Sequence, residues 1–191
     1  MPRSRRSKRT AILASAAVVA LGAIGTTSVF LVGSAQRRDD RAAYLRYERA
    51  ILVPIKDGGR LVEQEMKPSI ADLQSGSLPA SEAVDRANAW RTDLRQDKTK
   101  MVSLAPPKFL RGIEVLWGSA MDAYLEIPDI FARAAHATGP ARSALIGQAA
   151  AAGTRADRLF DRAARAMQFH RRRLGLGPTH DLPDPSSTAG S

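Results

Sequence analysis

The first strong pattern along the chain is an uncharged run from Thr10 to Gln36, which arginines flank on both sides. About 20 helical residues cross a hydrocarbon core of roughly 30 Å, so this run is long enough to span a bilayer. The sequence therefore predicts a transmembrane signal anchor at residues 10–36. A signal peptide cleaved near Ala35 is the alternative, although its apolar region would be unusually long.

After this run, apolar residues recur every three or four positions, which is typical of amphipathic α-helices. The first such segment predicts a helix at residues 37–75. Pro54, Pro68 and the pair Gly58 and Gly59 oppose it, because proline and glycine destabilise helix interiors. The unbroken spacing favours one long, kinked helix, and a break near Gly58 is the alternative. Its apolar face consists of Tyr44, Tyr47, Ile51, Ile55, Gly58, Val62, Met66, Ile70 and Leu73.

Three further helices are predicted, at residues 79–105, 107–137 and 140–174. Short turns rich in proline and glycine separate them, so consecutive helices must be antiparallel neighbours. The predicted fold class is all-α: an N-terminal transmembrane helix followed by an antiparallel (up-down-up-down) four-helix bundle with coiled-coil-like packing. The stretch from residue 175 to residue 191 is rich in glycine, proline and serine and predicts a disordered tail.

The charge of the chain has to be divided along its length before it is interpreted. The whole chain has 29 Lys and Arg against 19 Asp and Glu. Residues 1–9 are basic without an acid, but as many basic residues follow the run closely, so the flanking charges alone favour neither orientation. The resemblance of the N-terminus to an export signal predicts a cytoplasmic tail at residues 1–9, with the bundle extracytoplasmic in the plasma membrane. The remaining surplus is thin and predicts a mixed, solvated surface on the bundle. We therefore expect the lipid bilayer and another membrane or envelope protein as partners, and no nucleic acid.

Residues for metal or covalent chemistry are few. Cysteine is absent, and no glutamate is followed three positions later by histidine, the spacing that di-iron bundles use. His136, His170 and His180 have no helical ligand spacing among themselves. We therefore expect no metal, no cofactor and no enzymatic activity.

Two pairs of carboxylates four residues apart are interpreted as parts of a solvated, salt-bridged surface. These pairs are Asp122 with Glu126, and Asp157 with Asp161. The helical register turns Asp97 toward the core, where a carboxylate needs a partner such as Arg or Tyr. We expect helix splay to leave Asp97 wet at an edge instead.

Two sets of residues remain as candidate sites. Trp90, Trp117 and Tyr124 could line an apolar ligand pocket, although both tryptophans lie on the apolar stripe and core packing is the favoured explanation for them. Arg171, Arg172 and Arg173 close the last helix and could touch anionic lipid headgroups if that helix ends near the membrane. The same arginines also complement the negative end of the helix dipole.

The function predicted from these patterns is a single-pass, membrane-anchored helical bundle of the bacterial envelope. The bias toward arginine and alanine resembles proteins of GC-rich bacteria, and this resemblance implies no activity. The predicted role is a non-enzymatic scaffold or accessory interaction module. The alternatives are an extracytoplasmic bundle that binds or senses a small ligand, and a bundle secreted after signal-peptide cleavage.

Overall fold

The computed structural model describes residues 35–177 and residue 179, and every secondary-structure element in this part of the chain is helical. The chain divides into two compact units, residues 1–42 and residues 43–191. In the first unit, residues 35–42 are α-helical. The second unit holds four helices packed together, so the all-α fold class is confirmed for the described residues.

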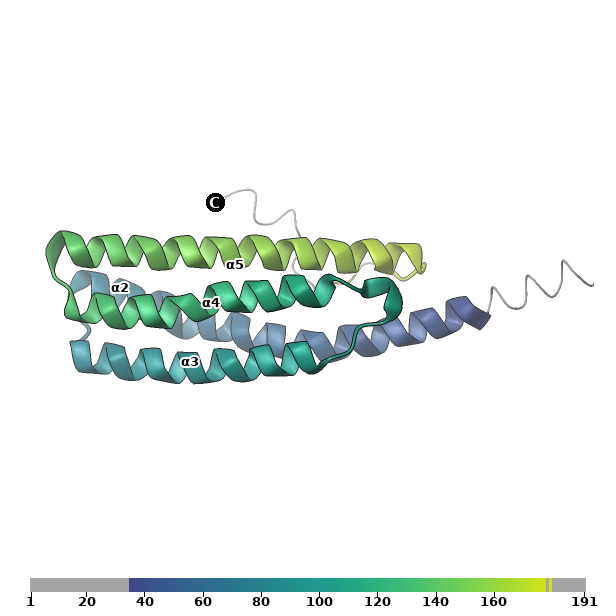
Figure 1. Ribbon diagram of the computed structural model, residues 1–191, viewed down its shortest axis with the longest axis horizontal. Coiled ribbons are helices and arrows are strands. Elements are labelled where there is room, and N and C mark those ends of the chain that lie inside the picture. Colours follow the sequence, from purple (N-terminus) through teal and green to yellow (C-terminus); the bar gives the residue numbers. More distant parts are fainter. Residues whose placement is uncertain (1–34, 178, 180–191) are drawn as a thin grey trace, which may run out of the picture. The chain divides into compact units, whose positions relative to one another are not determined.

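The second unit begins with an α-helical stretch that ends at residue 61 and continues through a π-helical turn, Val62–Met66, into α2, Lys67–Ser75. The other long helices are α3, Ala80–Ser103, α4, Ile113–His136, and α5, Gly139–Arg173. A short 3-10 turn, Lys108–Leu110, lies between α3 and α4. Helices that follow one another in the chain run in opposite directions, as Figure 1 shows.

The first helix of the bundle contains its irregularity at Pro68 and not at the glycines. Gly58 and Gly59 stay within regular α-helix, whereas the turn just before Pro68 widens to a π-helix. Proline has no N–H to donate, and its ring would clash with the carbonyl of residue 64 in a regular helix. A wide turn, in which the Lys67 N–H bonds to the Val62 carbonyl oxygen, accommodates that ring without ending the helix.

The third long helix begins at Ile113, whereas the sequence predicted a start at Pro107. Pro107 is extended, and Gly112 has a positive φ of 96°. A residue with this φ cannot lie inside a right-handed helix, so the helix can begin only after Gly112. The Gly112 N–H donates to the Glu114 carboxylate at 2.9 Å, which fixes the helix start. Leu110 is buried nonetheless, through the 3-10 turn.

The core of the bundle is formed by one face of each helix. Its largest fully buried side chains come from all four helices: Tyr44, Ile51, Met66, Leu73, Trp90, Leu94, Met101, Leu110, Trp117, Met121, Phe131 and Met167. On α5 the buried positions are mostly alanines, which let this helix approach its neighbours closely.

Within the described residues, no helix is both long and apolar enough to cross a membrane. The predicted span at residues 10–36 lies outside the described part of the chain except for its last two residues. The predicted basic tail at residues 1–9 and most of the predicted C-terminal tail also lie outside it.

Candidate functional site

The two tryptophans of the predicted pocket are core residues. Trp90 and Trp117 are each 1% exposed. Trp90 packs on Phe131 with ring centroids 4.8 Å apart, and Trp117 packs on Phe160 at 5.3 Å. Such tilted aromatic pairs stabilise the core beyond the area they bury. Neither tryptophan lines one of the cavities described next.

Tyr124 borders two cavities between the first helix and α5. One has a volume of about 310 Å³ and the other about 210 Å³, and Tyr124 and Asp157 belong to the walls of both. The smaller cavity opens where Gly58 and Gly59 leave room beside Phe160. The larger cavity lies beside the π-helical turn and α2, opposite small residues of α5.

The two residues that line both cavities form a hydrogen bond, in which the Tyr124 hydroxyl donates to Asp157 Oδ1. It joins α4 to α5. Burial raises the pKa of Tyr124, and the hydrogen bond to Asp157 adds to this, so the phenol stays protonated at neutral pH. A protonated phenol can donate a hydrogen bond but cannot act as a general base. The arrangement suits binding of an apolar molecule more than acid–base catalysis.

The carboxylates of α4 are held by cations from its two neighbours. Asp122 pairs with Lys98 of α3, and Glu126 pairs with Arg155 of α5. All four side chains keep substantial exposure. The interpretation of Asp122 and Glu126 as members of a salt-bridged surface agrees with these contacts.

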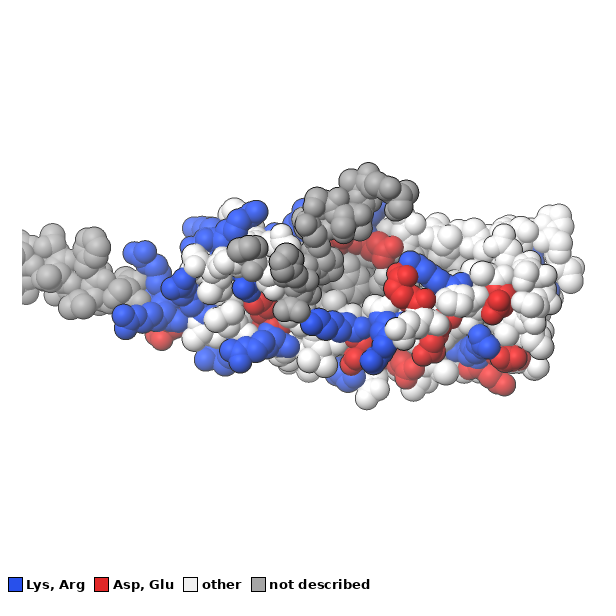
Figure 2. Space-filling model, turned by 180° about the vertical axis from the view of Figure 1, so that it is seen from behind, with Lys and Arg blue, Asp and Glu red and all other residues white. Residues whose placement is uncertain are grey.

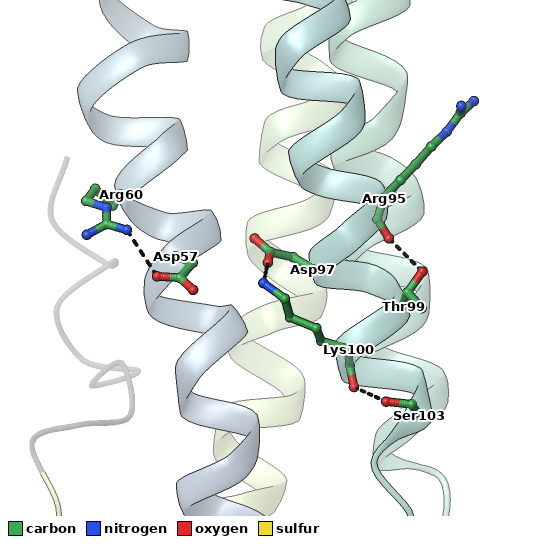
Figure 3. Close-up of polar contacts among 7 residues, drawn as sticks. All are labelled: Asp57, Arg60, Arg95, Asp97, Thr99, Lys100 and Ser103. Carbon is green, nitrogen blue, oxygen red and sulfur yellow. Dashed lines mark hydrogen bonds and ion pairs between the residues drawn. The ribbon is translucent and has the colours of Figure 1, made fainter.

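Asp97 is only 5% exposed, so the expectation that it lies wet at an edge was wrong. It points from α3 toward the first helix, and Lys100 Nζ donates to Asp97 Oδ1 at 2.9 Å (Figure 3). A Cβ atom at Gly58 would lie 3.8 Å from Asp97 Oδ2. That distance is an ordinary van der Waals contact, so the first helix covers the carboxylate closely at this point. The hydrogen bond to Asp97 raises the pKa of Lys100, which favours the protonated ammonium.

The three arginines of the predicted basic cluster at the end of α5 have different surroundings. Arg171 turns inward and pairs with Glu48 of the first helix, with side chains 15% and 6% exposed. The Tyr44 hydroxyl lies 3.1 Å from Glu48 Oε1 and 3.0 Å from the Met167 carbonyl oxygen. Arg172 and Arg173 remain exposed. Sequence reasoning missed Glu48, although its position four residues after Tyr44 on a buried face was a signal.

Of the two histidines that the structure describes, His136 is exposed and His170 packs beside aromatic rings. The His170 ring lies 5.8 Å from the Phe109 ring, and partial burial lowers its pKa, with nearby Arg173 adding to the effect. Among the described residues, no three His, Asp or Glu side chains come together as a metal site would require.

Folding also separates the charges of the bundle, so the expectation of an evenly mixed surface was wrong. Three stretches of the chain meet at one end of the bundle, where α3 ends, α4 begins and α5 ends. They are residues 43–50, 98–116 and 162–177. These three stretches hold 11 Lys and Arg but only two acids, Glu48 and Glu114. The stretches between them, residues 51–97 and 117–161, hold 10 Lys and Arg and 13 acids.

Figure 2 shows the result as blue side chains toward one end of the bundle and red ones interspersed further along it.

A scan of the chain against protein-family models, curated proteins and solved structures finds no match.

Proposed function

We propose that this protein is a membrane-anchored helical bundle that serves as a non-enzymatic interaction module of the bacterial envelope. The observation that carries the proposal is the uncharged run of residues 10–36, which precedes the bundle in the chain. The run has the length and polarity of a bilayer span. Residues 1–9 and the apolar run after them resemble an export signal, which favours a cytoplasmic N-terminus and an extracytoplasmic bundle.

An interaction role is supported by how the bundle distributes its apolar side chains. Its core is filled by interlocking side chains, while Val53, Val102, Val115 and Phe169 are each about half exposed or more. Three of them, Val102, Val115 and Phe169, lie toward the end of the bundle where α3 ends, α4 begins and α5 ends, and gathered apolar side chains favour contact with another surface.

Two measurements on cells test this proposal. Resistance of the full chain to extraction from membranes by alkaline carbonate is the expected sign of a spanning helix. An N-terminus at Gln36 in the mature protein would instead establish cleavage and a secreted bundle. Crosslinking in membranes followed by purification should recover a specific envelope protein with the chain. Recovery of the chain alone after efficient crosslinking would overturn the proposal that it is an interaction module.

A ligand-binding bundle is the second candidate, favoured by the two cavities that meet at Tyr124 and Asp157. An apolar, solvent-sensitive dye should then bind the full chain and fluoresce. The variant Gly153→Leu should abolish this signal because Gly153 lines the larger cavity and faces Ile127. Gly147→Leu is the matched control on α5, where no atom lies near. Equal dye binding by both variants would exclude these cavities as the site.

A further inference from the structure

We propose that the basic end of the bundle docks on the anionic headgroups of the membrane to which the chain is anchored. The basic end is defined by the exposed Arg46, Arg49, Lys108, Arg111, Arg162, Arg165, Arg172 and Arg173. The inference rests on the proposed membrane anchor for its tether. It adds a second membrane contact, made by the folded bundle itself.

The basic end is a product of topology, because its residues come from three stretches far apart in the chain. Arg46 and Arg49 lie at the start of the first bundle helix. Lys108 and Arg111 lie in the connection between α3 and α4, and the remaining residues lie in the last turns of α5.

The charges of the basic end are available to an external partner. Within the described residues, none of its eight side chains forms an ion pair. The two acids of this end are already engaged: Arg171 neutralises Glu48 in the interior, and Glu114 accepts the Gly112 N–H. A surplus of exposed, unpaired cations attracts a polyanionic surface, at about 1 kcal/mol for each Lys or Arg near anionic lipid.

Apolar side chains are exposed at the same end. Val102, Val115 and Phe169 are 52%, 64% and 49% exposed, and all three belong to the stretches that build the basic end. The Arg173 guanidinium lies 5.7 Å from the centre of the Phe169 ring. Exposed apolar groups among basic ones are typical of surfaces that enter the headgroup region of a membrane. A nucleic acid backbone would leave the valines without a partner.

The tether makes a membrane the favoured polyanion. The uncharged run ends at Gln36, and the bundle begins at residue 43 at its basic end. Seven residues reach at most about 25 Å when extended. A chain anchored by residues 10–36 therefore holds the basic end within a short distance of the headgroups, where weak attraction suffices for docking.

The absence of cysteine allows a direct test with the full chain in lipid vesicles. A fluorophore on Ser103→Cys reports the basic end, and the same label on Ser81→Cys reports the opposite end of α3, where the serine is also exposed. The vesicles are phosphatidylcholine carrying a headgroup-linked quencher, with or without phosphatidylglycerol as about a third of the lipid. We expect phosphatidylglycerol to increase quenching at residue 103 and not at residue 81.

Charge variants identify the residues responsible. The variant Lys108→Gln, Arg111→Gln, Arg172→Gln should lower the ratio of docked to undocked bundle about 100-fold, since each charge contributes about 5-fold. The control variant Arg95→Gln, Arg133→Gln, Arg158→Gln removes the same charge from exposed positions outside the three basic stretches and should retain most of the docking. Raising the salt from about 0.1 M to about 1 M should abolish docking by the parent chain.

Failure of docking and failure of the anchor give different results. A chain that floats with neutral vesicles but shows equal quenching at residue 103 with and without phosphatidylglycerol would overturn the docking proposal alone. A chain that floats only with anionic vesicles, in a salt-sensitive way, would overturn the anchor and support the lipid contact. A DNA duplex that binds through Lys108, Arg111 and Arg172 while anionic vesicles have no effect would replace lipid by nucleic acid as the partner.

Discussion

The Glu48–Arg171 pair joins the two ends of the bundle sequence, since Glu48 lies in the first helix and Arg171 in the last turn of α5. Both side chains are largely withdrawn from water, and Tyr44 supplies a further hydrogen bond to the carboxylate. Removing one partner of such a pair leaves an uncompensated buried charge, which is far more damaging than removing an exposed pair.

Glu48→Gln should lower the free energy of unfolding by about 3–5 kcal/mol, because Arg171 would then be buried without a counter-charge. Adding Arg171→Met should recover most of the loss. Urea unfolding of the full chain in a non-ionic detergent measures both effects. Glu63→Gln is the control, because the Glu63–Lys67 pair is more than 60% exposed and should matter by less than about 1 kcal/mol. A loss at Glu48 no larger than at Glu63 would contradict a buried pair.

Tyr47 should make the bundle sensitive to alkali. Burial raises the pKa of Tyr47 to about 12, with the charge of Glu114 adding to the rise. The folded chain therefore keeps the phenol protonated above pH 10, where the unfolded chain loses the proton. The stabilisation is complete below about pH 10 and declines toward pH 12, at no more than about 1.4 kcal/mol per pH unit.

Tyr47→Phe should accordingly unfold with a shallower dependence on pH between 10 and 12 than the parent chain. At neutral pH its stability should change by less than about 1 kcal/mol, since the buried hydroxyl has no hydrogen-bond partner among the described residues. Urea unfolding at pH 8 and at pH 11 provides the comparison. Parallel pH dependences for the two chains would show that Tyr47 does not titrate differently on folding.

At the residue scale, periodicity predicted which positions face inward but not what each side chain meets there. Trp90 and Trp117 were placed on buried faces, and they are buried. Asp97 is buried where α3 meets the first helix, and Arg171 turns inward to Glu48, far away in the chain. Contacts between helices are set by rotation and axial offset, which the pattern within one helix does not contain.

At the scale of the elements, apolar spacing predicted four helices because each must bury a continuous stripe. It could not locate the start of α4, since the apolar spacing continues through Leu110 while the backbone breaks at Gly112. Conversely, Gly58, Gly59 and Pro68 resemble helix breakers in sequence but lie inside one long helical element. Packing against neighbouring helices, α3 and α5 among them, outweighs their local propensities.

Alanine substitutions should distinguish a glycine inside a helix from a glycine that ends one, because their effects on the free energy of unfolding should have opposite signs. Gly59→Ala should stabilise the chain by up to about 1 kcal/mol, because Gly59 is helical and nothing lies near its missing Cβ. Gly76→Ala should destabilise it by about 1 kcal/mol or more, because Gly76 ends α2 with a φ of 82°. Thermal unfolding of the two variants gives the comparison. Stabilisation by Gly76→Ala would mean that α2 ends differently.

At the scale of the whole molecule, the fold converts a modest net charge into a strong asymmetry. Counting charges along the sequence conceals this, because the three basic stretches alternate with stretches in which acids outnumber bases. An up-down-up-down path places every second connection at the same end, so the basic stretches meet and the more acidic ones lie side by side. Charges gathered in this way repel one another in the folded state more than in the unfolded chain.

The basic end should therefore limit the stability of the isolated chain at low salt. Removing three of its charges with Lys108→Gln, Arg111→Gln and Arg172→Gln should raise the free energy of unfolding by about 0.5–1 kcal/mol, as expected for relieved like-charge contacts at the surface. High salt should erase this gain, because screening already weakens the repulsion in the parent chain. Thermal unfolding in a non-ionic detergent at low and high salt measures both values. Arg95→Gln, Arg133→Gln, Arg158→Gln should give no gain, since those arginines lie in stretches where acids are in excess. Equal stabilisation by both variants would mean that the repulsion belongs to the net charge of the molecule and not to the basic end.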